Sequence, residues 1–508
     1  MIYKSSLGRF IARNVLRGLC LVAMLTFAVI SNATITWSSG TNTVAPDTTL
    51  QDTQIVITGG TNTVQGLAGP PAGATSGGIL RLEAGGAGLQ ITGATVTLNS
   101  DSSSAGTLLI QGDVSTSASS TTAVIANGGS STHFGAVDLG SATGLFTIAA
   151  GSVPSFGPDL SITARVFDGG LEKAGPGILA LSGPNTYTGG TILDIGTFYI
   201  NSATAIGSGF FTINGPNTKI DNTSGLPITL SNNNQFNLTG GDLTFIGTND
   251  LNLGTGIVVM TNADRTITVA DSSATLTVGG RVQDAGQDRG LTKAGPGTLV
   301  LGGNSLYAGP TNVNAGTMTL AGSLGNTTVA VGVNGTFINN GTVNNNVSVS
   351  GVMGGTGTIN GMLTVNNGGI VDLTGGTFTV NGAIVNGGLF ILSNGTQLAG
   401  VTSFTNSNVL DIMTAGTFTP PPNFTNNGAI IDSSVVKTKS VSRSGSTITL
   451  TIDSYTGHTY QLQKSSSPGF NSLNNVGPSQ QGNTGTTLTF SDANATGVSS
   501  FYRILVNP

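Results

Sequence analysis

Residues 170–200 read GLEKAGPGILALSGPNTYTGGTILDIGTFYI, and residues 290–320 read GLTKAGPGTLVLGGNSLYAGPTNVNAGTMTL. The two stretches align without a gap at an offset of 290 − 170 = 120 residues. They share the run K-A-G-P-G and the distance from that run to a tyrosine, which indicates a duplicated module. The chain is therefore predicted to contain stacked, repeated supersecondary units.

The first copy shows what each module contains. Pro176-Gly177 predicts a type II turn, because proline fixes φ at the first central position and glycine accepts a positive φ at the second. The alternation that follows places Leu179 and Leu181 on one face of a short strand. Tyr187 falls in the next turn, where packing is its expected role. The second copy repeats all of these features.

The composition extends this β pattern to the whole chain. Charged residues make up 8 % and glycine 78 of 508 residues, whereas globular domains average about 25 % charged residues and about 7 % glycine. Hydrophobic residues reach 38 %, which is more than disorder requires. They form short alternating runs closed by Gly or Asn, such as residues 347–349, 363–365 and 378–380. An all-β protein is predicted.

The pattern L-x-K-x-G-P-G-x-L-x-L-x-G, continued by Y-x-G-x-T and G-T, resembles the autotransporter-associated β-strand repeat of Gram-negative passenger domains. Residues 331–380 resemble the weaker Gly/Asn coils that usually follow it. The resemblance implies a right-handed parallel β-helix on the cell exterior. It also implies a membrane-embedded export domain after the passenger, for which the stretch after the repeats is too short. We therefore expect that the chain does not export itself by that route, and its path across an outer membrane is left open.

A parallel β-helix also explains the composition independently. Each coil of about 20 residues pairs with the coils above and below, so that the inward face is apolar and the turns favour Gly and Asn. Identical Asn or Thr residues on successive coils satisfy one another along the axis. The open ends of such a stack need caps, and the region around Trp37 is the candidate for the N-terminal cap.

The N-terminus predicts a secretory signal at residues 1–33. Four cations precede an apolar run over residues 19–30, and Ser31-Asn32-Ala33 offers a small-x-small cleavage site. Cleavage would remove the single cysteine and leave 17 − 4 = 13 Lys and Arg against 22 Asp and Glu. This acidic mature chain argues against nucleic acid as a partner, and no later apolar segment is long enough to span a membrane as a helix. The four cations are Lys4, Arg9, Arg13 and Arg17.

Three further segments complete the expected organisation. Residues 34–165 are assigned to the N-terminal part of the β-helix with its cap, although a separate domain there remains an alternative. Residues 166–432 form the β-helix with the two repeats, and residues 433–508 form a small antiparallel β-sandwich. Lys437, Lys439 and Arg443 begin this last module. We interpret them as a charged edge strand that prevents pairing, with an anionic glycan site as the alternative.

The sequence predicts no catalytic, cofactor-binding or metal-binding residue. The densest cluster of charge is interpreted as solvated turn residues rather than an acid/base pair, and Asp284 to Asp288 matches no calcium loop. The two histidines, His133 and His458, lie far apart, and His458 is assigned a structural role. The cluster comprises Asp264, Arg265, Asp271, Arg281, Asp284, Asp288 and Arg289.

Two functional classes follow from these observations. The favoured one is a non-catalytic structural or adhesive surface protein, secreted or on the surface of a Gram-negative bacterium, with a periplasmic location as the alternative. The other is a polysaccharide-binding or polysaccharide-degrading β-helix in which Tyr187, Tyr199 and Tyr307 stack on sugars. The expected partner is an extracellular or envelope polysaccharide or matrix, and the oligomeric state is not determined by the sequence.

Overall fold

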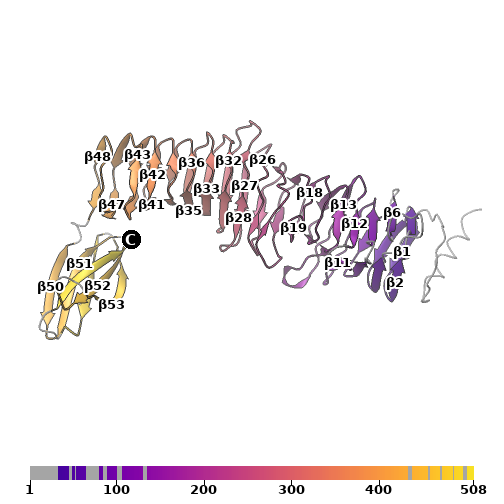
Figure 1. Ribbon diagram of the computed structural model, residues 1–508, viewed down its shortest axis with the longest axis horizontal. Coiled ribbons are helices and arrows are strands. Elements are labelled where there is room, and N and C mark those ends of the chain that lie inside the picture. The colour runs from indigo at the N-terminus through magenta and orange to yellow at the C-terminus, as the bar shows by residue number, and fades with distance from the viewer. Residues whose placement is uncertain are drawn as a thin grey trace, which may run out of the picture. The chain divides into compact units, whose positions relative to one another are not determined.

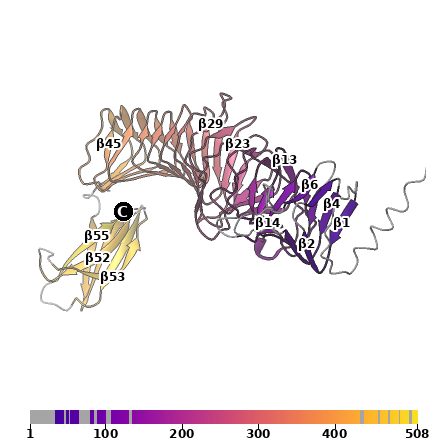
Figure 2. The ribbon, with the colours of Figure 1, turned by 45° about the vertical axis from the view of Figure 1, so that its right-hand side comes forward.

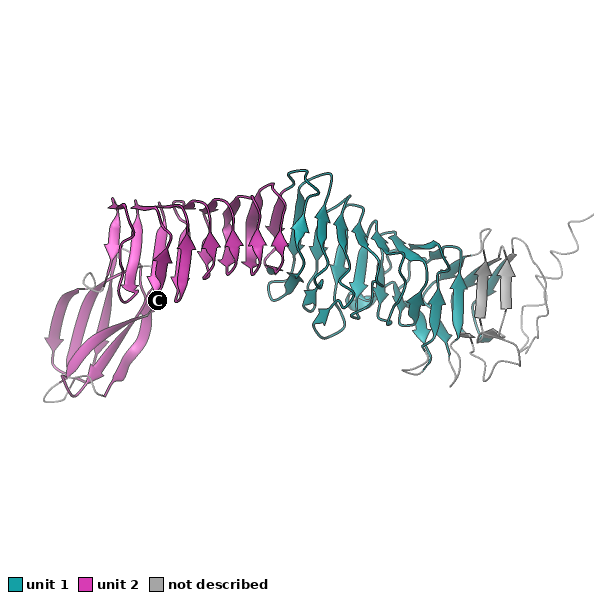
Figure 3. Cartoon of the chain, turned by 45° about the horizontal axis from the view of Figure 1, so that its top comes forward, with its two compact units in different colours: residues 1–289, 297–299 teal, residues 290–296, 300–508 magenta. Residues whose placement is uncertain are grey.

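The computed structural model describes residues 33–44, 48–51, 53–64, 79–83, 88–99, 106–129, 134–432, 437–455, 458–468, 472–483, 485–495 and 500–507. The chain divides into two compact units, residues 1–289 with 297–299, and residues 290–296 with 300–508 (Figure 3). The described residues form an all-β structure with one 3-10 turn, η1 (Pro154–Phe156). Their strands wind into a parallel β-solenoid of about 18 coils. The expected parallel β-helix is confirmed.

The first unit is a stack of coils whose strands pair in parallel with the strands of neighbouring coils. One ladder of eleven strands runs through it, and a second ladder of five strands forms another face (Figure 1). The eleven strands are β1 (Ala33–Trp37), β4 (Thr53–Ile57), β7 (Leu89–Ile91), β10 (Val114–Ser115), β13 (Thr143–Thr147), β16 (Gly170–Ala174), β18 (Thr191–Leu193), β20 (Phe211–Ile213), β23 (Phe236–Leu238), β26 (Val258–Met260) and β29 (Val282–Gln283). The five are β3 (Thr48–Gln51), β6 (Ile79–Glu83), β9 (Thr107–Ile110), β12 (Ala136–Asp138) and β15 (Arg165–Phe167).

A third face of this unit carries the strands of the first repeat. In it, β17 (Ile178–Leu181) pairs with β19 (Thr197–Ile200), which pairs with β21 (Lys219–Asp221). Leu179 and Leu181 point inward and are fully buried, as the alternation predicts. Further strands of this face are β2 (Thr41–Val44), β5 (Thr61–Val64), β8 (Thr95–Leu98), β11 (Ala123–Asn127), β14 (Leu160–Ile162), β24 (Leu243–Phe245) and β27 (Arg265–Val269). A separate parallel ladder contains β22 (Ile228–Thr229), β25 (Leu251–Asn252) and β28 (Thr275–Val278).

The second unit begins with coils of the same kind. One ladder of this unit has six short strands, β32 (Asn304–Ser305), β34 (Ser323–Leu324), β36 (Thr342–Val343), β39 (Thr358–Ile359), β42 (Thr377–Val380) and β45 (Gln397–Ala399) (Figures 1 and 2). The other coil strands are β30 (Leu291–Ala294), β31 (Thr298–Leu301), β33 (Thr311–Leu320), β35 (Val329–Asn339), β37 (Val347–Val349), β38 (Val352–Gly354), β40 (Leu363–Val365), β41 (Ile370–Thr374), β43 (Ala383–Asn386), β44 (Leu389–Ser393), β46 (Ser403–Asn406), β47 (Val409–Thr414), β48 (Phe424–Asn426) and β49 (Ala429–Ile431).

Asparagine ladders join these coils, as the sequence predicts. The Asn386 amide donates to Asn406 Oδ1 at 2.7 Å, and the Asn406 amide donates to Asn426 Oδ1 at 2.6 Å. Asn386 and Asn406 are fully buried, so these bonds satisfy polar groups that water does not reach. Phe390, Phe404 and Phe424 stack on the same coils with ring centroids 5.3 and 5.4 Å apart.

The C-terminal module of the second unit has two three-stranded antiparallel sheets. One is ordered β50 (Thr438–Ser444), β51 (Thr447–Ser454), β54 (Thr486–Asp492), and the other β53 (Asn474–Gln481), β52 (Thr459–Ser465), β55 (Phe501–Asn507). Leu450, Ile452, Tyr460, Leu462 and Phe490 form its buried core. The expected small antiparallel module is therefore confirmed.

The predicted turn at Pro176-Gly177 is wrong in one respect. The positive φ falls on the glycine before the proline, at +76° for both Gly175 and Gly295. The reason is that this conformation turns the Gly175 carbonyl toward a buried lysine, which accounts for the run K-x-G-P. Gly177 is required for space instead, because a Cβ there would lie 2.4 Å from the Ala149 carbonyl oxygen.

Several expectations fall at or beyond the limits of the described chain. Trp37, the candidate cap residue, is the last residue of β1 and is half-buried. The predicted signal segment lies outside the described residues except for Ala33, and His133 lies outside them as well. None of the described residues belongs to a helix that is long and apolar enough to span a membrane.

Candidate functional site

Each repeat contains a buried lysine that is bound by backbone carbonyls. Lys173 follows Leu171 by two positions on β16, so the strand alternation directs it into the coil interior, where it is 0 % exposed. Its Nζ donates to the carbonyl oxygens of Ala174 at 2.9 Å, Gly175 at 2.6 Å and Ile195 at 3.1 Å. The third bond links one coil to the next.

The second repeat builds the same arrangement. Lys293 is 0 % exposed, and its Nζ donates to the carbonyl oxygens of Ala294 at 2.8 Å, Gly295 at 2.7 Å and Ala315 at 3.0 Å. Three acceptors match the three protons of an ammonium group. The spacing between lysine and glycine is the same in the two modules. In both, the buried lysine hydrogen-bonds to carbonyl oxygens of neighbouring coils and so joins them.

Burial sets the protonation behaviour of both lysines. Removal from water disfavours the charged form and lowers the pKa of Lys173 to about 7, although Asp159 and Asp194 oppose this shift. The same cause lowers the pKa of Lys293 to about 8. Both side chains are enclosed within their coils, so neither is available to an external substrate.

The repeat tyrosines are interior residues and not sugar-stacking platforms. Tyr187 and Tyr307 are 0 % exposed, and their hydroxyls hydrogen-bond the Thr191 hydroxyl at 2.6 Å and the Thr311 hydroxyl at 2.7 Å. Tyr199 is 4 % exposed and is also unavailable to a ligand. The alternative role that assigned sugar stacking to these tyrosines is contradicted. Their apolar rings fill the coil turns instead.

The cluster of charge over residues 264–289 divides into exposed and buried members. Arg265 is buried, and its guanidinium donates to the carbonyl oxygens of Leu238, Thr239 and Thr261. The expectation that Arg265 is solvated is therefore wrong, because its position on β27 directs it inward. The exposed members are Asp264, Asp271, Arg281 and Asp288, and Arg289 is half-buried.

Asp284 is the second exception within this cluster. It is 3 % exposed, and its carboxylate accepts the backbone N–H groups of Gly286 at 2.9 Å and Arg289 at 3.1 Å. It therefore closes its own turn rather than facing solvent as predicted. Within the described residues, no group of three or more acidic, histidine or cysteine side chains could hold a metal ion.

The acidic pair that most resembles a catalytic dyad lies elsewhere. A hydrogen bond to Asp194 and partial burial raise the pKa of Glu172. Both residues are half-buried, Glu172 on β16 and Asp194 just after β18. Glycoside hydrolysis requires two carboxyl groups about 5 to 9.5 Å apart, and the raised pKa of Glu172 does not by itself assign the pair to that reaction.

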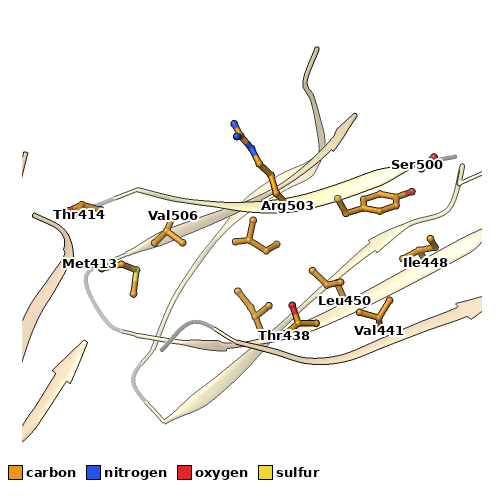
Figure 4. A pocket seen from close by; sticks show the side chains of 12 residues that line it. Met413, Thr414, Thr438, Val441, Ile448, Leu450, Ser500, Arg503 and Val506 are labelled. Carbon is orange, nitrogen blue, oxygen red and sulfur yellow. The ribbon is translucent and has the colours of Figure 1, made fainter. Parts of the chain in front are cut away.

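His458 has the structural position that the sequence predicts. It lies at the start of the C-terminal module, is fully buried, and contacts Asp411 of β47 through Nε2 and the carboxylate Oδ2. A cavity of about 670 Å³ opens nearby between β50, β51 and β55 (Figure 4). Its lining combines apolar side chains such as Leu450, Ile504 and Val506 with polar ones such as Thr438 and Arg503. None of the described residues that line this cavity is acidic.

The basic residues at the start of the module lie on an edge strand. β50 pairs only with β51 within its sheet, and Lys437, Lys439 and Arg443 are exposed along or beside it. Lys439 forms an ion pair with Asp453 at 3.0 Å. Charged side chains on an edge strand hinder pairing with another sheet, in agreement with the favoured interpretation.

The outer surface of the six-stranded ladder is polar and regular. Thr342 pairs with Thr358, which pairs with Thr379, so that the three hydroxyls follow one another along the coils. Two residues further along each strand, the Asn360 amide donates to Asn344 Oδ1 at 2.7 Å, and the amide of Asn381 donates to Asn360 Oδ1 at 2.8 Å. We call these six side chains the polar ladder face.

Comparisons with known proteins agree with this structure. The passenger-associated transport repeat matches residues 171–199 and 291–320, which are the two lysine-containing modules. The adhesin BmaC autotransporter of Brucella suis biovar 1 (strain 1330) is 32 % identical over 154 residues. That alignment covers 29 % of this chain but only 4 % of the adhesin. No solved structure matches the chain at a significant level.

Fold and repeats together define the class of the protein. A parallel solenoid of coils that contains two passenger-associated transport repeats is a passenger-like β-helix protein. The two repeats and the similarity to part of an autotransporter adhesin support an exported β-helix protein. The resemblance to passenger repeats that the motif indicates is thereby confirmed.

Sequence reasoning missed several of the features that organise the coils. The burial of Lys173 and Lys293 could have been found from their alternation with Leu171 and Leu291. The polar ladder face could have been found from the similar segments at 340–344, 356–360 and 377–381. No local signal pairs Asp411 with His458, because they come from different modules.

Proposed function

We propose that this protein is a non-catalytic adhesin on the surface of a Gram-negative bacterium, where its coils present polar faces to an external partner. The observation that carries the proposal is the pair of passenger-associated repeats within a parallel solenoid. The similarity to an autotransporter adhesin supports the same role. The lysines and tyrosines of the two repeats are buried and hold neighbouring coils together. Binding of an external partner therefore depends on side chains that face outward.

Protease shaving tests the location. Intact cells that make the protein are treated with protease and probed with an antibody to the C-terminal module, with lysed cells as the control. Loss of the signal from intact cells is the expected result. Protection until lysis would indicate a periplasmic protein and would contradict the surface role.

Adhesion requires its own measurement. Cells that lack the protein are expected to bind less to a glycan or matrix surface than cells that make it, and re-expression is expected to restore binding. Equal binding by both strains, with the protein shown to be at the surface, would contradict the adhesive role.

The alternative is a polysaccharide-degrading β-helix, and its best candidate residues are Glu172 and Asp194. Replacement of Glu172 by Gln removes the acid while preserving its shape. Any glycan cleavage by the native chain that this replacement abolishes would overturn the non-catalytic proposal. The same holds for cleavage that depends on Asp264, Asp284 or Asp288.

A further inference from the structure

Three segments of the second unit repeat one short pattern. Residues 340–344 read NGTVN, residues 356–360 read TGTIN, and residues 377–381 read TFTVN. In each, the apolar residue between Thr and Asn points inward and is 0 % exposed, namely Val343, Ile359 and Val380. The core thus fixes the register. The flanking threonines lie on β36, β39 and β42 and are half-buried, and the asparagines directly after these strands are exposed.

The outward side chains retain hydrogen-bonding capacity. Within the ladder, each Asn amide donates once, Asn344 to the Leu324 carbonyl oxygen at 2.9 Å and the others to the preceding Asn. An amide side chain offers two donors and two acceptor lone pairs, so half of this capacity or more is available to a ligand. Across the described residues, the hydroxyls of Thr342, Thr358 and Thr379 make no hydrogen bond to a side chain.

The surroundings of the face are uncharged. Between Lys293 and Asp411 the sequence contains one charged residue, Asp372. Asp372 lies on β41, which pairs with β38 and β44 and therefore belongs to a different ladder. A charged ligand would lose hydration here without gaining an opposite charge, whereas a neutral hydroxyl-rich ligand exchanges one set of hydrogen bonds for another.

The spacing of the face is set by the coils. Successive rungs of a sheet are about 4.8 Å apart, and side chains two residues apart along a strand are separated by about 6.6 Å. A β-1,4-linked hexose chain is extended and advances by about one rung per sugar. Alternate sugars are turned over, so one edge of the chain presents the 2- and 3-hydroxyls and the 6-hydroxymethyl group in alternation. A hydroxyl of each sugar can therefore meet the Thr and Asn side chains of each rung.

We propose that the polar ladder face binds a neutral, extended β-linked polysaccharide laid along the coil axis. This proposal rests on the adhesive function and names the chemistry of its partner. Protein interfaces depend on buried aromatic and arginine side chains, and nucleic acid requires cations. The six residues of the face include none of these.

Binding of the full-length chain to insoluble cellulose and to cellohexaose tests the proposal, by pull-down and calorimetry. Amylose, which is α-linked and coiled, and carboxymethyl cellulose, which is charged, serve as comparison ligands. The expected result is binding to the neutral β-glucans that is stronger than binding to either comparison ligand. This binding should change little with salt, because no ion pair contributes.

A triple replacement identifies the face. Thr342→Val, Thr358→Val and Thr379→Val together remove three hydroxyls and keep β-branched side chains that suit a strand. We expect at least about tenfold weaker binding, because three hydrogen bonds to the ligand are lost. The matched control is Thr336→Val, Thr364→Val and Thr405→Val, three half-buried threonines on β35, β40 and β46. Unchanged thermal unfolding shows that both variants fold.

Each remaining outcome decides against the proposal. Equal binding by the two triple variants would place the glucan elsewhere. If the native chain binds no glucan while cells still adhere, the partner is not a neutral β-linked polysaccharide. The adhesive function would then stand without this partner. Light scattering measures self-association of the chain. If the triple replacement on the polar ladder face abolishes self-association and the control replacement does not, a second copy of the chain occupies the face.

Discussion

The coils before residue 290 and those after residue 300 satisfy their interior polar groups in different ways. In the earlier coils, single charged side chains such as Lys173, Asp221 and Arg265 are buried, and each bonds several groups around one turn. In the later coils, rows of asparagine bond to one another from coil to coil, as Asn386 and Asn406 do. The earlier region is the irregular one and the later region is the uniform one.

Coil length also varies more in the earlier region. Earlier pairings such as Val114 with Phe146 and Phe211 with Phe236 join positions that are 32 and 25 residues apart. In the later coils, Asn pairs recur at separations of 16, 20 and 21 residues. An asparagine ladder requires identical residues at equivalent positions, which short coils of similar length provide. In the longer earlier coils, Asp221 and Arg265 bond groups that are 26 and 27 residues away in the sequence.

The largest expected effect comes from removing a buried charged side chain. Lys173→Met preserves much of the side-chain volume but leaves the carbonyls of Ala174, Gly175 and Ile195 without their donor. We expect a loss of about 3–5 kcal/mol in the stability of the surrounding coils, measured by amide hydrogen exchange. Lys219→Met, at an exposed position on β21, is the control. Equal protection from amide hydrogen exchange in both variants would contradict the proposal that the buried ammonium of Lys173 stabilises the coils.

A somewhat smaller loss of stability is expected when Asp221 is replaced. Its buried carboxylate accepts the N–H groups of Asn222, Gly247 and Thr248 and also the Thr248 hydroxyl. Asp221→Ala leaves these donors buried without acceptors, at a cost of about 2–3 kcal/mol by hydrogen exchange. Asp242→Ala, at an exposed carboxylate, should cost less than about 1 kcal/mol. A reversed order would refute the stabilising role of the buried carboxylate.

Asn406 tests the ladder of the later coils. Asn406→Ala removes its donations to Asn426 and to the Ala429 carbonyl oxygen and deprives Asn386 of its acceptor. We expect a loss of about 2 kcal/mol that extends to the coils on both sides. Asn426→Ala, at the exposed end of the row, should cost about half as much. An effect confined to one coil would show that the rows do not couple neighbours.

The two buried lysines predict a dependence of stability on pH. Burial lowers the pKa of Lys173 to about 7 and that of Lys293 to about 8, below the value of about 10.4 in an unfolded chain. Between these values the unfolded chain binds more protons, so stability rises as pH increases, by at most about 1.4 kcal/mol per pH unit for each lysine. Thermal unfolding between pH 7 and pH 9, below the ordinary titration of tyrosine, measures this rise. A variant with Met at both positions should show a flatter profile.

The smallest effect is expected from the exposed acids of the earlier region. Asp264→Asn together with Asp288→Asn should change stability by less than about 0.5 kcal/mol and leave adhesion unchanged. Unfolding and cell-binding measurements on this variant check both points. A marked loss of adhesion with normal stability would move the binding surface from the later coils to the earlier ones.

The sequence by itself determined the repeat and the strand pattern. The spacing of K-A-G-P-G, the alternation at Leu179 and Leu181, and the frequent Asn and Gly residues are local properties. Local properties are sufficient for a solenoid, because each coil contacts only its neighbours. The same reasoning predicted the antiparallel module, whose strands alternate clearly between apolar and polar residues.

Only the tertiary structure decided which polar residues meet. The bonds of Lys173 to Ile195 and of Asn360 to Asn344 depend on the length of each intervening coil, which the sequence alone does not reveal. The contact between Asp411 and His458 joins two modules with separate patterns. The burial of Arg265 likewise depends on the coil beneath it, whose carbonyls replace the water that an exposed guanidinium would bind.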